Sequence, residues 1–445
     1  MLSWTLPTLL STWIDRFQVV IDRRLRELVP ALLAGLLLCT ERRRTCTSWF
    51  RTAGITREFR RAYRVVCLTG RRTPVLAGSV LHDIRTTVAS TGSDRIKLAL
   101  DDTPSPRYGP QVEGAGVHHN PTPGPAHQPF LYGHNYVTLA WLAEHPQWGT
   151  IALPLKAELY VREKDLPQID PERRPVFRTK LEQAAGLIEW LGKQLENEEK
   201  PIWLAIDGGY AKRPVLAAAR REGIAVVGRL RCDAALRSLP GPQPASKRGP
   251  KPTYGRDVIS LAKRAGHPRG WTTAKLVLYG EEVTKTYKTF LATWKPAGGV
   301  IRVVVVKEAD QWVAFFTTAV AASVAEILEM VADRNSLEQT FKDVKEVWGA
   351  GQQQLRNLHA NVGAWHLNLW AYTMVELWAW DRPEEELVDR SASPWDRAPR
   401  RPSHADRRKA LRRSSLREEF RQACTGPAQR AKLHAFAEHL LRCTT

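Results

Sequence analysis

Hydrophobic and polar positions change their spacing along the chain, and these changes divide it into parts. In residues 1–90 the apolar positions recur at helical spacing, which predicts a compact all-helical segment. From residue 95 onwards, short apolar runs bounded by turn residues replace that pattern, as is typical of buried strands. Three such runs, at 95–102, 133–142 and 149–160, follow one another through turns and predict an antiparallel meander.

A strand-helix-strand unit follows the meander. After a helix at 177–196, the expected elements are a strand, a helix and a strand at 201–207, 211–222 and 223–231. Two strands joined by a helix pair in parallel through a right-handed crossover. The order β-β-β-α-β-α-β therefore predicts an α/β fold for this part of the chain.

The segment 331–348 has the pattern of an amphipathic helix with one apolar stripe. The stripe consists of Leu337, Phe341, Val344 and Trp348. Glu338 and Lys345 are seven residues apart, so they stand on one helix face beside that stripe. Two interpretations are open: a solvated pair on an ordinary helix, or a carboxylate and an amine placed to hold a cation and a phosphate.

Two of the predicted strands end in acidic residues. Asp101 and Asp102 close the run RIKLALDD, and Asp207 closes PIWLAID. Each acid alone can be a turn residue, and Asp207 followed by two glycines passes as a plain turn. A buried strand gains nothing from ending in an acid, however, and two such ends together with Glu338 suggest one acidic site.

These acids resemble those of the DDE transposases of bacterial insertion sequences, specifically the insertion-sequence-four superfamily with its Y-x2-R-x3-E-x6-K signature. The signature is matched by Arg334, Glu338 and Lys345 at the family's spacing, with Val331 in place of the tyrosine. The segments LALDDT and AIDGGY are similar to those that carry the family's two aspartates. Neighbouring strand residues point to opposite faces, so only one of the first pair faces the site, and the resemblance aligns Asp101.

The resemblance implies a ribonuclease-H-like catalytic core in which Asp101, Asp207 and Glu338 bind Mg²⁺, with Mn²⁺ as a substitute. Magnesium prefers hard oxygen ligands, and two such ions about 3.5 to 4 Å apart serve phosphoryl transfer. The implied activity is cut-and-paste DNA transposition by a protein that forms a homodimer on DNA. Two alternatives stay open: a nuclease of the same fold that does not join strands, and a transposase-derived DNA-binding protein that is no longer catalytic.

Composition agrees with a nucleic-acid partner. The chain has 66 Lys and Arg against 46 Asp and Glu, a net charge of +20 that attracts a polyanion. A hydrophobic content of 43% excludes a mainly disordered protein. Six cysteines without a C-x-x-C pair indicate reduced thiols, and the apolar run 28–39 is too short for a membrane span. We therefore expect a cytoplasmic, nucleoid-associated protein of bacterial type.

The first 90 residues contain 15 arginines, no lysine and six acids. Their arginines are either a solubilising surface or phosphate contacts, and by resemblance this segment begins to bind the terminal inverted repeats. The candidate DNA contacts are Arg42, Arg43, Arg44, Arg57, Arg60, Arg61 and Arg64. Arg334 and Lys345 are further candidates from the signature.

The stretch between Asp207 and Glu338 is longer than the core requires and resembles the β-rich insertion of the same superfamily. It begins with a basic loop that either lines DNA or is solvated. Its candidate contacts are Arg229, Arg231, Lys247, Arg248, Lys251, Arg256 and Lys263. The resemblance also implies a hairpin step in which an extruded base stacks on an aromatic ring, and Trp294 is our choice over Trp271 and Trp312.

The expected domains are a helical DNA-binding domain, the core in two parts around the insertion, and a tail. Their bounds are 1–92, 93–232 with 318–380, 233–317 and 381–445. Within the core, a second apolar helix is expected at 357–380, and the loop 109–133 is expected on the surface near DNA. That loop contains His118, His119 and His127, with His134 just beyond its end, at a spacing that fits no metal pattern. From residue 381 to 415 we expect a mobile basic linker, followed by a short terminal helix.

Overall fold

The computed structural model describes residues 4–88, 93–120, 128–241, 250–278, 280–309, 311–390, 395, 401–423 and 433. The predictions for Lys247, Arg248 and His127 lie outside these residues. None of the described helices is long and apolar enough to cross a membrane.

The core is a mixed β-sheet whose first strands have the predicted pairing. They are β1 (Ile96–Pro106), β2 (Gly116–His119), β3 (Phe130–His145), β4 (Gly149–Tyr160), β5 (Ile202–Ile206) and β6 (Ala225–Leu230). β1, β3 and β4 form an antiparallel meander. β5 lies parallel to both β1 and β6. The short strand β2 pairs with β3 inside the segment that was expected to be a loop.

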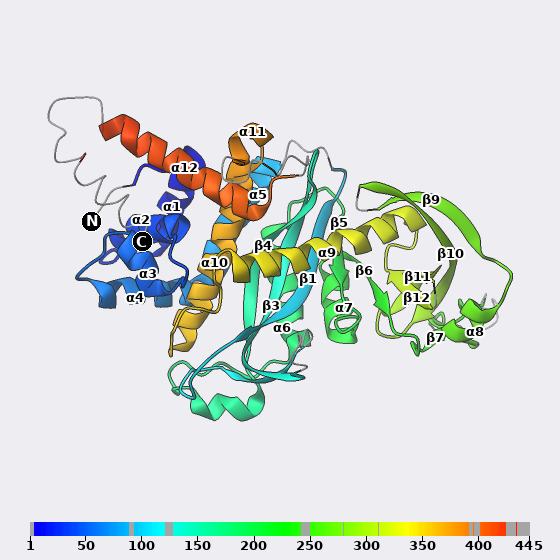
Figure 1. The fold of residues 1–445 in the computed structure, drawn as a ribbon. Helices are drawn as coiled ribbons and strands as arrows, with labels where there is room; N and C mark the ends of the chain where they lie inside the picture. The colour runs from blue at the N-terminus through cyan, green and yellow to red at the C-terminus, as the bar shows by residue number, and fades with distance from the viewer. Residues whose placement is uncertain are drawn as a thin grey trace.

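Helices cover both faces of this sheet (Figure 1). They are α6 (Lys180–Gln194), α7 (Arg213–Arg221), α9 (Val324–Glu346) and α10 (Leu358–Ala379), and a 3-10 helix, Glu163–Gln168, lies between β4 and α6 in the chain. α9 begins at a capping box, in which the side chains of Ser323 and Glu326 bond each other's backbone N–H. Small side chains on the sheet pack beneath α9 and let it lie close to the strands. These are Ala99, Ala140, Ala152 and Ala205.

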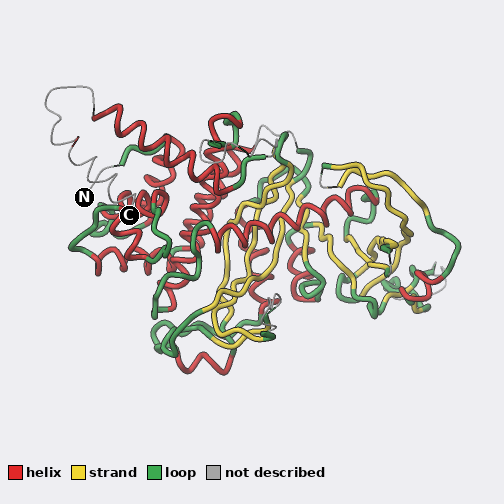
Figure 2. The backbone as a smooth tube through the Cα atoms, viewed as in Figure 1, coloured by secondary structure: helices red, strands yellow, loops and turns green. Residues whose placement is uncertain are grey.

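The insertion continues the core sheet. It contains β7 (Leu236–Arg237), β8 (Val258–Ile259), α8 (Leu261–Gly266), β9 (Thr272–Leu278), β10 (Glu281–Trp294), β11 (Gly299–Lys307) and β12 (Trp312–Thr317). β12 pairs with β6, and β11 and β10 follow outward in the same sheet. Figure 2 shows these strands curving away from the core. The β-rich insertion is therefore joined to the core by backbone hydrogen bonds between β12 and β6.

The N-terminal part described here is helical throughout its regular structure. Its helices are α1 (Thr8–Val20), α2 (Leu28–Leu38), α3 (Cys46–Thr52), α4 (Phe59–Arg71) and α5 (Thr73–Val88). α4 crosses α10 where two glycines meet the opposite backbone: a Cβ at Gly70 would lie 1.8 Å from the carbonyl oxygen of His359, and one at Gly363 would lie 1.9 Å from that of Val66. The buried side chains of these helices belong to the same apolar cluster as those of α10. This segment thus shares its core with the sheet domain.

The tail differs from the predicted mobile linker. α11 (Glu384–Leu387) is followed by α12 (His404–Ala423), so the helix begins well before residue 415. Arg407 and Arg408 of α12 are buried. Arg407 forms an ion pair with the fully buried Glu376 of α10, and Arg408 donates a 2.7 Å hydrogen bond to the carbonyl of Cys39. For the part of that linker from His404 onward, the expectation was wrong, because the chain is helical there and these arginines have partners inside the protein.

Candidate functional site

A long open cleft runs along the ends of β1 and β5, beneath α9 and beside β12. Its volume is about 1580 Å³, whereas pockets for small molecules usually hold about 300 to 1,000 Å³. The cleft is lined by acidic and basic side chains from all these elements. Those that matter below are Asp101, Asp207, Arg229, Arg334, Glu338 and Lys345.

Two of the predicted acids are neighbours in the sheet. Leu100 of β1 is paired with Ile206 of β5, so Asp101 and Asp207 are the next residues on two adjacent parallel strands. The carboxylate of Asp207 is exposed in the turn that follows β5, where its Oδ2 accepts a 3.3 Å hydrogen bond from the N–H of Gly209. Parallel strands end at the same edge of a sheet, which is where open α/β sheets place their ligands.

Asp101 and Asp102 have different partners, as expected for successive strand residues. Asp102 accepts hydrogen bonds of 2.6 Å from Lys180 and 2.6 Å from Tyr210. Although burial opposes ionisation, these partners hold the pKa of Asp102 below its ordinary value. Asp101 instead forms an ion pair with Arg334 of α9. Burial raises the pKa of Asp101 to about 6, with Arg334 opposing the rise and the charges of Asp102 and Asp207 adding to it.

Helix α9 brings the three signature residues to the same cleft. Arg334 lies between two carboxylates, since its Nη1 is 3.4 Å from Oε1 of Glu338 while its Nη2 contacts Asp101. The side chain of Glu338 is 62% exposed and faces the cleft. Lys345 donates a 2.7 Å hydrogen bond to Oγ1 of Thr103, and burial lowers its pKa to about 8.

The side chains at this site have the chemistry of a magnesium site. Asp101, Asp207 and Glu338 offer hard carboxylate oxygens at an open, wet surface, and such a site leaves room for waters and phosphate oxygens. Within the described residues, however, these three acids are not among the groups whose ligand atoms lie within 4.8 Å of one another. The guanidinium of Arg334 contacts Asp101 and Glu338 at this position.

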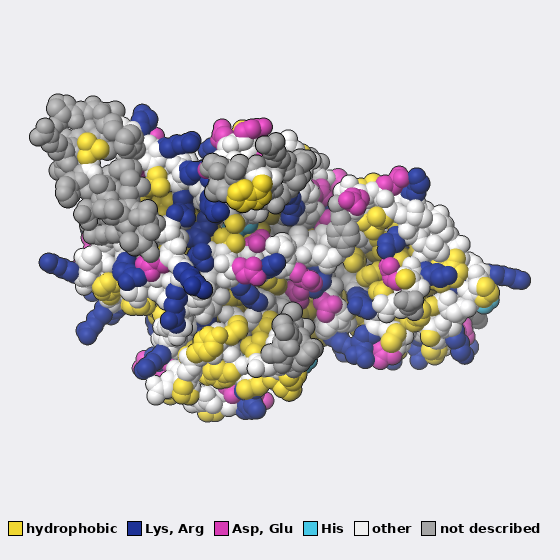
Figure 3. Space-filling model, in the orientation of Figure 1, with side chains coloured by type: hydrophobic (Ala, Val, Ile, Leu, Met, Phe, Trp, Pro, Cys, Tyr) yellow, Lys and Arg dark blue, Asp and Glu magenta, His cyan; other side chains and the backbone are white. Residues whose placement is uncertain are grey.

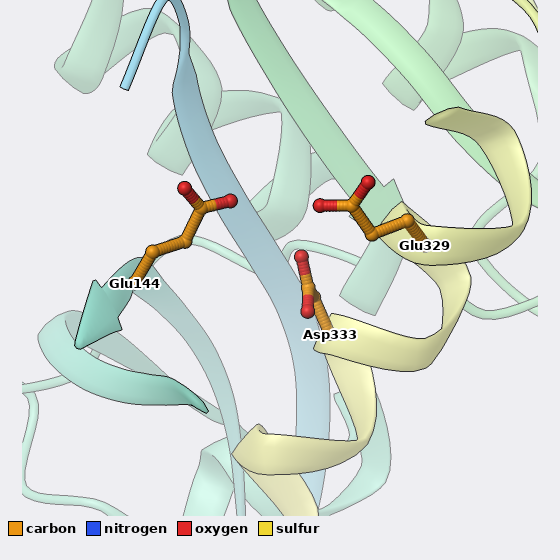
Figure 4. A group of neighbouring side chains, drawn as sticks. All are labelled: Glu144, Glu329 and Asp333. Carbon is orange, nitrogen blue, oxygen red and sulfur yellow. The ribbon is translucent and has the colours of Figure 1, made fainter. Parts of the chain in front are cut away.

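Another acidic cluster, outside the cleft lining, has the tighter geometry (Figure 4). Oxygens of Glu144, Glu329 and Asp333 converge within 4.8 Å. The amine of Lys97 on β1 is paired with all three, at 2.6 Å from Glu329 and 2.9 Å from Asp333. The carboxylates outweigh the desolvation of this buried lysine and raise its pKa. The protein's own ammonium therefore occupies the position that a cation would take.

Sequence reasoning missed this second cluster, although a signal was present. Lys97 is a charged residue in the middle of an otherwise apolar strand run. A lysine at such a position requires acidic partners from the elements that pack on the strand.

The basic residues predicted to contact DNA differ in their exposure and in whether they are paired with other residues of the chain. Arg42, Arg43, Arg57, Arg60 and Arg64 are exposed. Arg61 pairs with Glu27 and Glu58, and Arg44 is half-buried and bonded to the carbonyl of Glu346, so both contribute to the fold. In the insertion, Arg231 also pairs with an acid, Asp233. The other described candidates are all exposed, and they are Arg229 on β6 of the core and Lys251, Arg256 and Lys263 in the insertion. Figure 3 shows Lys and Arg side chains gathered beside the N-terminal helices and on the lower edge of the insertion.

The placement of Trp294 contradicts the stacking role that was predicted for it. Its side chain is only 7% exposed and packs edge-on against Phe316, with ring centroids 5.1 Å apart. A tryptophan in the core has no ring face available for an extruded base. Trp271 is also engaged, since the amine of Lys288 lies 4.6 Å from its ring centre, and Trp312 is half-buried within β12.

Two of the described histidines of the 109–133 segment and its end, His118 and His134, are buried, whereas His119 is exposed. His134 is buried, accepts a 2.9 Å hydrogen bond from Arg107 and lies 3.0 Å from the carbonyl of Glu113. His118 lies in β2, and burial lowers its pKa to about 4.

Comparison with known proteins places the chain in a family. A search of curated proteins finds no match. The sequence family described as DDE superfamily endonuclease matches residues 16–296, which is more than half of the chain. The match includes both strand aspartates and ends before α9, so it does not test the signature residues. Membership implies a metal-dependent, nuclease-type enzyme whose substrate is DNA. The chain belongs to the DDE superfamily endonucleases.

Proposed function

We propose that this protein is a cut-and-paste DNA transposase of the insertion-sequence-four type. It binds the terminal inverted repeats of its element, cleaves the DNA at their ends and joins the freed 3′ ends to target DNA. The observation that carries the proposal is that Asp101, Asp207 and Glu338 all line one open cleft that also contains Arg334 and Lys345. A protein that only bound DNA would gain nothing from three acids beside a polyanion.

In this mechanism Asp101, Asp207 and Glu338 would hold Mg²⁺, and the bound ion would supply activation of the attacking oxygen and stabilisation of the leaving oxygen. Lys345 reaches the cleft from the same helix face as Glu338, so its ammonium is placed to bind a phosphate beside the acids. Tyr210 and Lys180 fix Asp102, and this contact anchors the turn after β5 that presents Asp207.

The insertion contributes one wall of the cleft. Val313 and Phe315 of β12 line it opposite α9, and Arg229 extends from β6 beside them. Since β12 continues the core sheet, this wall keeps a fixed position relative to Asp207. Duplex DNA that enters the cleft therefore contacts the insertion and the core together. We propose that two copies of the chain act on one pair of element ends.

The test is an end-cleavage assay with the full chain. Labelled duplexes that carry the DNA flanking the gene for this chain are incubated with a target plasmid and Mg²⁺ or Mn²⁺. We expect metal-dependent cleavage at a fixed position on each flank and covalent joining of the label to the plasmid.

Other outcomes identify the alternatives. Cleavage that is never followed by joining indicates a nuclease without strand transfer. Specific binding without cleavage in either metal indicates a DNA-binding protein that has lost catalysis, and it overturns the proposal.

A further inference from the structure

Arg334 and the proposed metal require the same oxygens. The guanidinium contacts Asp101 through Nη2 and Glu338 through Nη1, from one side chain that is only 14% exposed. A divalent cation bound by these two acids would occupy the space between them. A guanidinium in direct contact with these carboxylate oxygens covers them and repels an incoming divalent cation, so the two cations compete for the same oxygens.

We propose that Arg334 is a competitor of the metal at this site and that phosphate in the cleft relieves the competition. The inference rests on the proposed function, because it assumes that Asp101 and Glu338 are metal ligands. When no DNA is bound, the guanidinium of Arg334 contacts both carboxylates. When DNA enters, a phosphate oxygen takes over Arg334, and the acids become available to Mg²⁺.

Two features of the side chain support this exchange. The Nε–H of Arg334 is buried and has no hydrogen-bond partner, so the ion pair leaves one of its donors unsatisfied. A guanidinium also binds phosphate through paired donors at least as well as it binds a carboxylate. Moving Arg334 onto a phosphate thus costs little and uncovers Asp101.

The consequence is a coupling between DNA and metal. If Arg334 leaves Asp101 only when phosphate is present, metal affinity is low in the free protein and rises on DNA, and linkage requires the reverse effect as well. Such a device keeps the acids from binding metal productively until the substrate is in place.

The experiment measures Mn²⁺ binding to the full-length protein without DNA, from the spin-resonance signal of free Mn²⁺. Arg334→Met keeps the length of the side chain and removes the competing charge. We expect this variant to bind Mn²⁺ roughly tenfold more tightly than the parent, a coupling within the usual range between sites. Arg382→Met is the matched control, since Arg382 is also ion-paired with a glutamate four residues away, Glu386, but lies outside the cleft lining. It should bind Mn²⁺ as the parent does.

A second arm adds a short random-sequence duplex and compares DNA affinity by fluorescence anisotropy in Mn²⁺ and in EDTA. The parent should bind DNA more tightly in Mn²⁺, and Arg334→Met should show a smaller ratio. If Arg334→Met does not fold, Arg334→Lys provides the same comparison. A single ammonium group cannot bridge both acids as the two Nη groups of the guanidinium do.

The failures are distinguishable. Equal or weaker Mn²⁺ binding by a folded Arg334→Met overturns the competition and leaves the proposed function intact. If instead neither the parent nor a folded Arg334→Met binds Mn²⁺, or adding Asp101→Asn to Arg334→Met leaves its Mn²⁺ binding unchanged, then the metal assignment itself fails.

Discussion

Two clusters of acids lie along the contact between β1 and α9, and they are built from similar parts. In the first, Lys97 is surrounded by Glu144, Glu329 and Asp333. In the second, four residues further along β1 and one residue further along α9, Arg334 faces Asp101 and Glu338. Each has a cation from the chain among carboxylates, yet only the second opens onto the cleft.

The difference shows that convergence of acids is a poor guide to function by itself. The Lys97 cluster has the closer oxygens, but a buried ammonium bridges them and ties α9 to the sheet. The Arg334 cluster lines the cleft, has an unsatisfied donor and has a neighbour, Asp207, at the end of the adjacent parallel strand. Access to a cleft and incomplete pairing distinguish a site for a ligand from a site that holds the fold.

The largest expected difference between the clusters is in catalysis. Glu338→Gln should leave folding and DNA binding nearly intact and lower cleavage by on the order of a thousandfold, because an amide cannot replace an anionic metal ligand. Glu329→Gln, a like change on the same helix, should cleave at close to the parental rate. The measurement is the rate of cleavage of labelled element ends by each variant. Similar losses of cleavage in both variants would contradict the different roles assigned to the two clusters.

The two neighbouring aspartates of β1 provide the next comparison. Asp101→Asn should abolish metal-dependent cleavage. Asp102→Asn should cleave measurably but unfold at a lower temperature, because Lys180 and Tyr210 lose their charged partner. Single-turnover cleavage and thermal melting are measured on both proteins. Normal cleavage by Asp101→Asn with none by Asp102→Asn would show that the opposite carboxylate faces the reaction.

Lys97→Met tests what the Lys97 cluster contributes to stability. It leaves three acids without their cation, and we expect the free energy of unfolding to fall by about 2 to 3 kcal/mol. This is less than for a fully buried pair because Glu144 and Glu329 are 36% and 46% exposed. Urea unfolding measures the change, and Lys97→Arg should lose less. An unchanged midpoint for Lys97→Met would mean that this cluster does not stabilise the contact of α9 with β1.

The smallest effect concerns Lys345, whose pKa burial lowers to about 8. Between about pH 8 and the ordinary lysine value near 10.4, the unfolded chain binds this proton and the folded chain does not, so the contribution of Lys345 to stability rises with pH. Phosphate binding needs the charged amine, so DNA affinity should fall several-fold from pH 7 to 9. Lys345→Arg should flatten that profile, as measured by anisotropy at constant ionic strength. A parental profile that is already flat would remove Lys345 from the phosphate contacts.

Local patterns allowed much of the core to be predicted from sequence. The apolar runs around Asp101 and Asp207 have strand length and end at turns, and the structure confirms both strands and the predicted parallel pairing of β5 with β6. The α9 helix was expected from its apolar stripe, and it begins earlier than that stripe, at the cap of Ser323.

Long-range partners were what sequence reasoning could not reach. Nothing near Arg407 in the sequence reveals the buried Glu376 that accepts its charge, so a docked helix was mistaken for a mobile linker. Trp294 is the last residue of β10, and only the folded sheet shows that Phe316, two strands away, packs against it. In the same way, Arg334 was predicted as a phosphate contact, and its ion pair with Asp101 depends on how α9 crosses β1.

The central claim is that the metal binds at the Arg334 cluster in the cleft and not at the Lys97 cluster. The most direct measurement replaces Mg²⁺ with Fe²⁺ in the DNA-bound protein and adds ascorbate and peroxide, so that radicals formed at the ion cut the nearest backbone. Mass spectrometry then locates the cuts. The account predicts breaks in β1 near Asp101, in the turn at Asp207 and in α9 near Glu338, all lost when excess Mg²⁺ competes. Breaks centred on Lys97, Glu144 and Glu329, with none at Asp207, would contradict it.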